Sequence, residues 1–411
     1  MRSKPFASFA STVGQLLALV LAILVTGAGA AGVKESVIHA FRQTDGSQPL
    51  AGFIADDTGN LYGTTSHGGN FLLGTVFELS PGPGGTWSET ILYAFQGQSD
   101  GSLPYGTLVV DKTGNLYGIA QAGDVNARGE VFELTKGANG TWTESVIYRF
   151  TSSDQPPNGD LTWDSNGNLY GTTPHGGKPQ SGEVFELSPQ QDGSWKETVL
   201  YVFPGTTGLG DLVAGVTFDD KGNLYGAAGG SNGGEGGVYE ISPQQNGQWT
   251  ATVIHNFTGG ADGGYPDSKL VFDANGNLYG TTNGPNYGEV FELIPSQGGV
   301  WTEQTLHNFV NGGSDGLKPQ GTIVFDANGN LYGTTPIGGV GCNQASCGTV
   351  YRLSPQAGGV WKEMILHHFE SASDGSLPQA GLFLDNAGHL FGTTKCGGGR
   401  YGYGTVFEIS K

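Results

Sequence analysis

The sequence predicts an all-β protein: a seven-bladed β-propeller with four antiparallel strands in each blade, closed by an N-terminal strand that joins the C-terminal blade. The first supporting observation is a repeat. The phrase GNLYGTT occupies residues 59–65, 167–173, 276–282 and 329–335, and near copies begin at Gly114, Gly222 and Gly388. Its aromatic residue recurs every 53 to 59 residues, at Tyr62, Tyr117, Tyr170, Tyr225, Tyr279, Tyr332 and Phe391. A period this long is typical of propellers and solenoids.

The second observation is that each repeat contains four strand-like segments. The first ends on an acidic residue, as in GTLVVD at 106–111, and the second contains the repeated phrase. The third resembles VFEL at 76–79, and the fourth begins at a tryptophan such as Trp87 and ends at a phenylalanine such as Phe95. Turn signals rich in Asp, Gly, Asn and Pro separate the segments. Four strands per unit predict a propeller blade.

The third observation concerns the two ends of the chain. Segments one to three occur seven times, whereas the complete fourth segment with its tryptophan occurs six times. The seventh lies at the other end, because KESVIHAF at 34–41 matches KEMILHHF at 362–369. The N-terminal strand is therefore expected to complete the last blade, which removes exposed sheet edges.

Residues 1–30 have the pattern of a secretory signal peptide. Arg2 and Lys4 precede an apolar run at 17–25, and Ala28-Gly29-Ala30 forms a small-x-small cleavage site. The run is shorter than the roughly 20 apolar residues of a membrane helix. We expect a single propeller domain over residues 31–411, with a repeat period of about 54. We expect it to be secreted, periplasmic or extracellular, without a membrane span after cleavage.

The charge balance bears on possible partners. The chain has 37 acidic and 18 basic residues, a formal net charge of −19. Because proteins grip a phosphate backbone through Lys and Arg, we expect no nucleic-acid partner. The acidity favours solubility outside the cell, and we expect a monomer.

The repeated unit resembles the GloVer tandem repeat of bacterial secreted proteins. The resemblance rests on the seven copies of the phrase and covers the whole of 31–411. It implies an exported protein of undefined activity, in a family whose members carry interchangeable surface-anchoring tails. This sequence ends at Ser410-Lys411 without such a tail, so we do not expect one to hold it at the surface. The Asp-x-x-Gly-Asn-aliphatic-Tyr core also resembles NHL-type blades.

Alternation along a strand explains the phrase. Tyr62 and Gly63 point to opposite faces, so the tyrosine is expected to supply bulk and the glycine clearance where neighbouring blades pack. Seven aspartates precede the glycine of the phrase by three residues. We interpret them as turn residues that accept backbone hydrogen bonds, in preference to calcium ligands, which would need several clustered acids. They are Asp56, Asp111, Asp164, Asp219, Asp273, Asp326 and Asp385.

Glutamates and histidines recur at fixed places in the third and fourth strands. The glutamates, twelve around the ring, are expected to form a solvated outer rim. His39, His255, His307 and His367 occupy the slot that Tyr93, Tyr148 and Tyr201 hold in other repeats, which favours packing over metal binding. His67 and His175 lie in non-adjacent blades, too few for the three or four ligands of a zinc site. We expect no metal site, no cofactor and no catalytic residues.

Departures from the repeat mark the candidate binding surface, which lies in the variable loops between strands two and three. Its members are Phe71, Arg128, His175, Lys395, Arg400, Tyr401 and Tyr403. These aromatic and cationic side chains favour a non-catalytic protein that binds a glycan or another exported protein. The alternatives are a polysaccharide-active enzyme, either a lyase or a glycoside hydrolase, and a structural component of the cell envelope.

The three cysteines are Cys342, Cys347 and Cys396. In an exported protein a pair is expected to form a disulfide, and Cys342 with Cys347 is the closest pair in sequence. A bridge from Cys396 to either partner remains open, because both segments lie in equivalent loops of neighbouring repeats.

Overall fold

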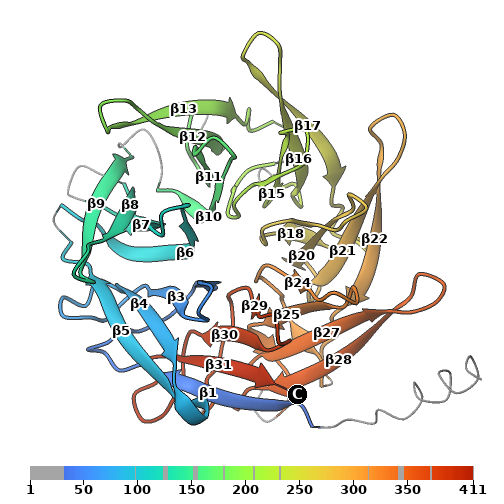
Figure 1. The fold of residues 1–411 in the computed structure, drawn as a ribbon. Helices are drawn as coiled ribbons and strands as arrows, with labels where there is room; N and C mark the ends of the chain where they lie inside the picture. Colours follow the sequence, from blue (N-terminus) through green and yellow to red (C-terminus); the bar gives the residue numbers. More distant parts are fainter. Residues whose placement is uncertain are drawn as a thin grey trace, which may run out of the picture.

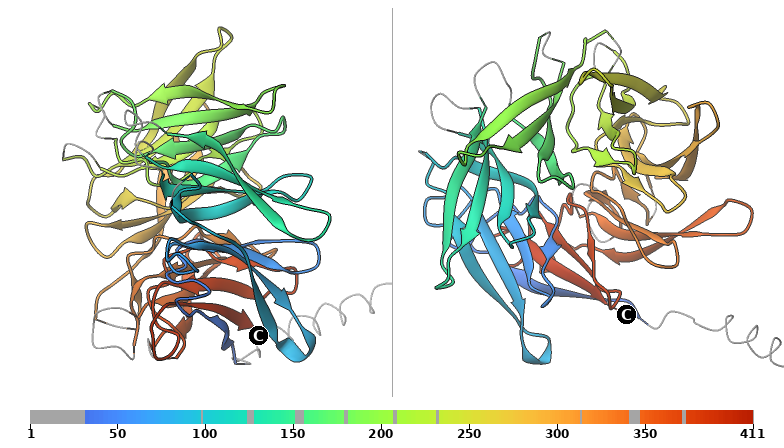
Figure 2. Two further views of the ribbon diagram at one scale, coloured as in Figure 1. Left: turned by 90° about the vertical axis from the view of Figure 1, so that its left-hand side faces the viewer. Right: turned by 45° about the horizontal axis from the view of Figure 1, so that its top comes forward.

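The computed structural model describes residues 32–410, apart from 98, 124–127, 151–155, 179–180, 207–208, 231–232, 313, 341–346 and 371–372. Its strands form seven blades of four antiparallel strands around one axis, which confirms the predicted seven-bladed β-propeller (Figure 1). The views in Figure 2 show each blade as a twisted sheet. The proposed signal segment 1–30 lies outside the described residues. Within the described part, no helix has the length and apolar character needed to cross a bilayer.

The blades share one order of strands. The first strands, nearest the axis, are β2 (Ile54–Ala55), β6 (Ser102–Val110), β10 (Asn158–Trp163), β14 (Thr217–Phe218), β19 (Val271–Phe272), β24 (Val324–Phe325) and β29 (Phe383–Leu384). The second strands are β3 (Leu61–Thr65), β7 (Leu116–Ala122), β11 (Leu169–Thr173), β15 (Leu224–Ala228), β20 (Leu278–Gly284), β25 (Leu331–Thr335) and β30 (Leu390–Thr394). The third strands are β4 (Thr75–Pro81), β8 (Glu130–Lys136), β12 (Glu183–Pro189), β16 (Gly237–Pro243), β21 (Glu289–Pro295), β27 (Thr349–Pro355) and β31 (Thr405–Ser410).

The fourth strands form the outside of the ring. They are β5 (Trp87–Ala94), β9 (Trp142–Arg149), β13 (Trp195–Val202), β17 (Trp249–Asn256), β22 (Trp301–Asn308), β28 (Trp361–His368) and β1 (Lys34–Ala40). Three short strands and one turn of 3-10 helix complete the fold: β18 (Gly264–Pro266), β23 (Gly316–Leu317), β26 (Ile337–Gly338) and η1 (Pro83–Gly85).

The ring closes through β1 and β31. The two strands pair antiparallel from Lys34 opposite Ser410 to Ala40 opposite Thr405. The backbone N–H of Phe41 then donates to the carbonyl of Gly404 at 3.0 Å. The N-terminal strand is thus the fourth strand of the C-terminal blade, as the sequence predicted.

The turn after each first strand is built around its aspartate. Oδ1 of Asp56 accepts hydrogen bonds from the backbone N–H groups of Thr58 and Asn60, at 2.9 and 3.0 Å. Its Oδ2 accepts from the Asn60 amide at 2.8 Å and from the Tyr62 hydroxyl at 3.0 Å, and Gly59 takes a φ of 85°. Partial burial opposes the effect, but the hydrogen bonds from the Thr58 hydroxyl, from Asn60 and from the Thr58 N–H lower the pKa of Asp56 to about 2. The interpretation as a turn residue is confirmed.

The aromatic residue of the phrase packs against the next blade. Tyr62 of blade one shares a buried cluster with Phe132 and Leu134 of blade two, and its ring meets Trp142 edge-on at 6.5 Å. The described core divides into such clusters, each combining the phrase aromatic of one blade with the core of the next. The recurrent interface explains the recurrent tyrosine.

The glycine of the phrase has a different role from the one expected. A Cβ at Gly63 would lie 2.9 Å from Phe77 Cζ and 2.9 Å from Phe53 Cε1, and both rings belong to the same blade. Gly63 stands directly opposite Phe77 in the antiparallel ladder, so the two residues share one face of the sheet. The expectation of clearance for a neighbouring blade was wrong; the glycine makes room for the phenylalanine of its own third strand.

The glutamates do not form a solvated rim, which corrects a second expectation. Oε1 of Glu133 in β8 accepts from the Tyr117 hydroxyl at 2.7 Å. In the fourth strands, burial and, to a smaller extent, the nearby Asp45 raise the pKa of Glu89 to about 7. The reason is geometric: each fourth strand lies beside the connection that enters its blade, so its glutamate faces that junction.

Candidate functional site

Two positions of the first strands and their approaches line a channel at the centre of the ring. Counted back from the turn aspartate, the sixth residue of each blade is Leu50, Tyr105, Asn158, Val213, Asp267, Gln320 or Gln379. The fourth residue back is Gly52, Thr107, Asp160, Gly215, Lys269, Thr322 or Gly381. The first strands and their approaches thus present two rings of seven residues to the channel, and three residues of the second ring are glycines.

Small residues keep the channel narrow. Gly159 has a φ of 85°, and a Cβ there would lie 2.5 Å from the backbone nitrogen of Gly215 in the next blade. A Cβ at Gly106 would likewise lie 2.5 Å from the carbonyl oxygen of Gly159. Neighbouring blades therefore touch backbone to backbone at the axis, and the side chains of the two rings occupy the space that remains.

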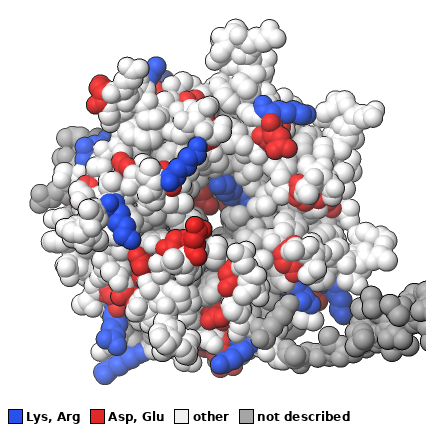
Figure 3. All heavy atoms as spheres, viewed as in Figure 1, with Lys and Arg blue, Asp and Glu red and all other residues white. Residues whose placement is uncertain are grey.

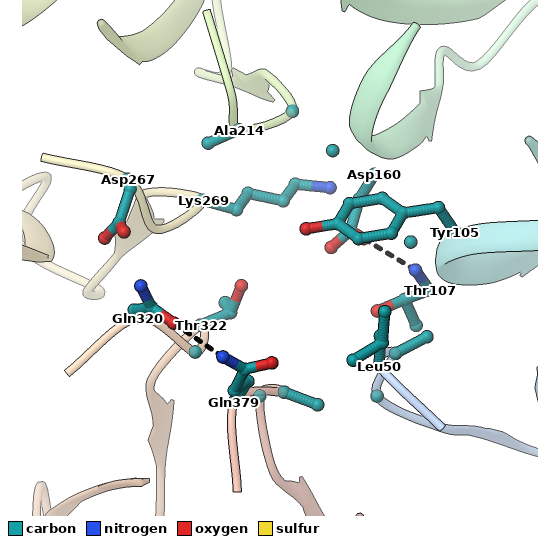
Figure 4. Close-up of a pocket in the computed structure, with 18 of the residues that line it drawn as sticks. Leu50, Tyr105, Thr107, Asp160, Ala214, Asp267, Lys269, Gln320, Thr322 and Gln379 are labelled. Atoms are coloured by element: carbon teal, nitrogen blue, oxygen red, sulfur yellow. Dashed lines mark hydrogen bonds between the residues drawn. The ribbon is translucent and has the colours of Figure 1, made fainter. Parts of the chain in front are cut away.

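In the ring formed by the fourth residue before each turn aspartate, most members are Gly or Thr. Lys269 and Asp160 are the exceptions, and they carry opposite charges. Nζ of Lys269 donates to Thr162 Oγ1 at 2.8 Å, and Oδ1 of Asp160 accepts from the backbone N–H of Thr107 at 2.7 Å. Protein surrounds Lys269 even though part of its surface faces the channel. This burial lowers its pKa, and the charge of Asp160 partly offsets the effect. Figure 4 shows Lys269, Asp160 and Tyr105 directed toward one another.

Asp267 comes from the same blade as Lys269 and lies across the channel from Asp160 and Tyr105, near Gln320 and Gln379 (Figure 4). Its Oδ2 accepts from the Asn283 amide at 2.6 Å, while Oδ1 has no hydrogen-bond partner among the described residues. Burial raises the pKa of Asp267 to about 8, so this carboxyl is mainly protonated at neutral pH. The channel therefore contains the protonated carboxyl group of Asp267 and the ammonium group of Lys269, whose charged form burial disfavours. Both groups can donate hydrogen bonds to a polar ligand.

One mouth of the channel widens into a cavity of about 440 Å³. Its wall includes Tyr105, Asn158 and Asp267 from the channel, together with Asp211 and Tyr265 from connections between blades. This volume falls within the range of small-molecule sites. Figure 3 shows a face hollowed at the centre of the ring, with basic and acidic atoms both at the hollow.

One position in the connections between blades has an unusual backbone conformation, and two of its residues, Asp211 and Tyr265, line this mouth. Eight positions before the turn aspartate, non-glycine residues adopt left-handed φ values of 53° to 59°: Gln48, Leu103, Asp211, Tyr265, Lys318 and Leu377. Such residues persist only where the surroundings fix them. The N–H of Tyr265 donates to the carbonyl of Glu235 at 2.7 Å, so a loop of the preceding blade helps to fix this residue.

The predicted loop residues lie on four consecutive blades: seven, one, two and three. None of the seven is among the residues that line the channel or its mouths. Arg128 and His175 are exposed, and Lys395 is half-buried. His175 comes nearest to the channel, because its Nε2 lies 3.8 Å from Oδ1 of Asp211 on the rim. The predicted surface therefore adjoins the mouth without forming it.

Blades seven and one carry an aromatic group. The rings of Tyr401 and Tyr403 stack with centroids 6.0 Å apart, and the Arg400 guanidinium lies 5.7 Å from the Tyr401 ring. Tyr401 is 66% exposed and Phe71 is 51% exposed. Gln43 links the two loops, since its side chain accepts from the Tyr403 hydroxyl at 3.3 Å and its carbonyl accepts from the N–H of Gly69.

The channel residues were not predicted from the sequence, because residues that differ from the repeat pattern were sought only in the longest loops. The signal was nevertheless present: the residue four positions before the turn aspartate is Gly or Thr in five blades, but Asp160 and Lys269 in the others.

Of the cysteines, Cys347 is disulfide-bonded and buried, and Cys396 is free. Cys342 lies outside the described residues.

Fold and site together define a closed seven-bladed propeller with an asymmetric polar channel. The chain belongs to the Gloeobacter/Verrucomicrobia repeat family, whose model matches residues 28–228 and 213–411. No curated protein matches the sequence significantly.

Several solved structures have a similar fold. An ulvan lyase from a new family of polysaccharide lyases has a TM-score of 0.56 at 11% identity, over 90% of this chain and 95% of that chain. A protein from Lactobacillus plantarum has a TM-score of 0.52 at 15% identity, over 78% of this chain and 84% of that chain. A PQQ-bound aldose sugar dehydrogenase from Streptomyces coelicolor has a TM-score of 0.47 at 12% identity, over 92% and 98%. At these identities the likeness shows the fold alone.

Proposed function

We propose that the chain is an exported, non-catalytic propeller that binds a carbohydrate at the channel mouth. The observation that carries the proposal is the chemistry of that mouth. Its wall combines phenols, carboxamides and carboxyls, as in Tyr265, Asn158 and Asp211, within a cavity of about 440 Å³. Sugar hydroxyls both donate and accept hydrogen bonds. Phenols, carboxamides and carboxyls together offer the donors and acceptors that such hydroxyls need.

The neighbouring loops extend the proposed site for a longer glycan. Tyr401 and Phe71 expose aromatic faces, which can cover the apolar faces of sugar rings. Arg400 beside Tyr401 adds a cation on an acidic body, suited to an acidic sugar. An exported protein is the alternative occupant of this surface.

The lyase of similar fold supplies the first probes. It has been solved with a -[GlcA(1-4)Rha3S]- fragment bound, at a TM-score of 0.54 and 11% identity. We would therefore test uronate-containing and neutral polysaccharides by affinity electrophoresis and calorimetry. The expected result is saturable binding that the Tyr265→Ala variant weakens at least tenfold.

Tyr287 provides a matched control. It lies in the same blade as Tyr265, and both residues are 40% exposed, but only Tyr265 lines the mouth. Tyr287→Ala should bind as the unchanged chain does. Equal losses in the two variants, or no saturable binding to any glycan, would reject the channel mouth as a carbohydrate site.

A polysaccharide-active enzyme is the second candidate, favoured by the channel chemistry. Lys269 has a lowered pKa and lies across from Tyr105, whose own pKa is raised by burial and by Asp160 and Asp267. Such a pair could serve as base and acid in an elimination. Incubation with polysaccharide would then release products with new double bonds, detected by ultraviolet absorbance, and Lys269→Met would abolish the release. Binding without product supports the non-catalytic function.

A further inference from the structure

The junctions between blades repeat a group of three polar side chains. A histidine or tyrosine near the end of a fourth strand meets the aspartate of the following connection and a glutamate from the fourth strand of the next blade. Between blades five and six these residues are His307 in β22, Asp315 in the connection and Glu363 in β28. Three separate segments thus bring a nitrogen and two carboxylates together.

The distances at this junction match a metal site. Nε2 of His307 lies 3.3 Å from Asp315 Oδ2 and 3.5 Å from Glu363 Oε1. One ligand atom from each residue lies within 4.8 Å of the others. Zinc bonds of about 2.0–2.2 Å place tetrahedral ligand atoms roughly 3.3–3.6 Å apart. Both distances fall within that range, and the first is also a hydrogen bond when no ion is bound.

We propose that His307, Asp315 and Glu363 bind a divalent transition-metal ion, best matched by Zn²⁺, and thereby join blades five and six. One imidazole and two carboxylates suit zinc, and water would supply a fourth ligand. This site lies away from the channel, and the proposal does not depend on carbohydrate binding.

Two carboxylate oxygens at the junction lack hydrogen-bond partners, although Oδ2 of Asp315 accepts from the backbone N–H of Val310 at 2.9 Å. Asp315 is only 9% exposed, and its Oδ1 has no hydrogen-bond partner among the described residues. Oε1 of Glu363 is also buried without one. Two carboxylates buried side by side repel each other unless a cation or a proton lies between them. A bound cation would satisfy both.

A second junction has the same composition with a wider spacing. His39, Asp45 and Glu89 form the other such group among the described residues, and His39 Nε2 lies 3.8 Å from Asp45 Oδ2. Where tyrosine replaces histidine, the junction has no imidazole ligand. The hydroxyl of Tyr93 donates directly to Asp100 Oδ2 at 2.6 Å. The chain therefore contains a version of this junction in which a phenol replaces the proposed imidazole ligand.

That version defines the test. The full chain would be stripped with a chelator, dialysed and titrated with Zn²⁺ alone by calorimetry, with metal content measured by atomic emission. His307→Tyr places at this junction the residue that blades one to three carry there, so it should fold. We expect it to bind one Zn²⁺ fewer than the unchanged chain and to lose part of the zinc-dependent rise in Tm.

Two further variants keep the test decisive. Glu363→Gln preserves the shape of the junction and should weaken zinc binding at this site at least tenfold, even if His307→Tyr is unstable. His255→Tyr changes a histidine that belongs to neither three-ligand group, and it should keep the full zinc content. The proposal is overturned if the unchanged chain binds no zinc above background, if Glu363→Gln binds zinc normally, or if His255→Tyr loses as much as His307→Tyr; a proton would then be what holds the carboxylates together.

Discussion

Gly171 and Phe185 stand directly opposite each other in the third blade, and the phenylalanine ring covers the glycine. A Cβ at residue 171 would lie 2.5 Å from Phe185 Cζ and 3.2 Å from a methyl carbon of Leu161. The packing of this strand therefore requires a residue without a side chain at position 171. This pairing of glycine and aromatic residue recurs in the other blades, for example between Gly63 and Phe77.

The first prediction follows from that contact. Gly171→Ala should lower the free energy of unfolding by about 1–3 kcal/mol, because the added methyl overpacks a filled core. In a Phe185→Leu background, which lacks the Cζ atom, the same substitution should cost less. Urea denaturation of the four proteins of this cycle measures the coupling. Equal costs in both backgrounds would show that the ring does not limit residue 171.

The second prediction concerns ring closure. Deleting residues 34–40 removes β1 and leaves β31 as an open edge, so the protein should unfold at lower temperature and self-associate. A synthetic peptide KESVIHAF should restore the Tm and suppress the added self-association by supplying the missing strand. A scrambled peptide is the control. Rescue by both peptides, or by neither, would contradict a closure specified by this strand.

The third prediction concerns Tyr93 and Asp100. Asp100 is 5% exposed and accepts the Tyr93 hydroxyl at 2.6 Å. Tyr93→Phe removes the donor and should lower the free energy of unfolding by about 1–3 kcal/mol. Tyr93→His should cost less, since His39, His255 and His367 take this place at other junctions and face an aspartate there. Equal stabilities of the two variants in urea would exclude the hydrogen bond as the cause.

The fourth prediction is a pH dependence from Asp267. Its carboxyl has a pKa of about 8 in the folded protein, against about 3.9 in an unfolded chain. Between these values the folded state holds a proton that the unfolded state has lost, so the free energy of unfolding falls as the pH rises. Asp267→Asn carries no titrating group there, and its loss of stability from about pH 5 to about pH 8 should be smaller than in the unchanged chain.

The slope will not vanish entirely in that variant. Burial, together with the nearby carboxylates of Asp100 and Glu130, also raises the pKa of Glu144 to about 8, and it contributes with the same sign. Asp57→Asn, at an exposed position, is the control and should keep the original slope. If Asp267→Asn shows that same original slope, the carboxyl is ionised in the fold and the account of its burial is wrong.

Local features were predictable because they depend on neighbours in sequence. The turn at Asp56 forms from hydrogen bonds that reach at most six residues ahead, to Tyr62. The match between residues 34–41 and 362–369 predicted closure for a similar reason, since a repeat that lacks one strand must take it from the other end. The role of Gly63 was misjudged because alternation gives the face of a side chain and not the residue that fills it.

The period of the repeat, read from the sequence, determined the number of blades, the order of their strands and the turn chemistry, because each blade is a local unit of about 54 residues. Only the tertiary structure decided which side chains meet at the axis and at the junctions. Lys269 donates to Thr162, 107 residues earlier, because closing the ring brings the first strands of distant blades into contact. Neither alternation nor spacing encodes that contact; it arises from the curvature of the whole ring.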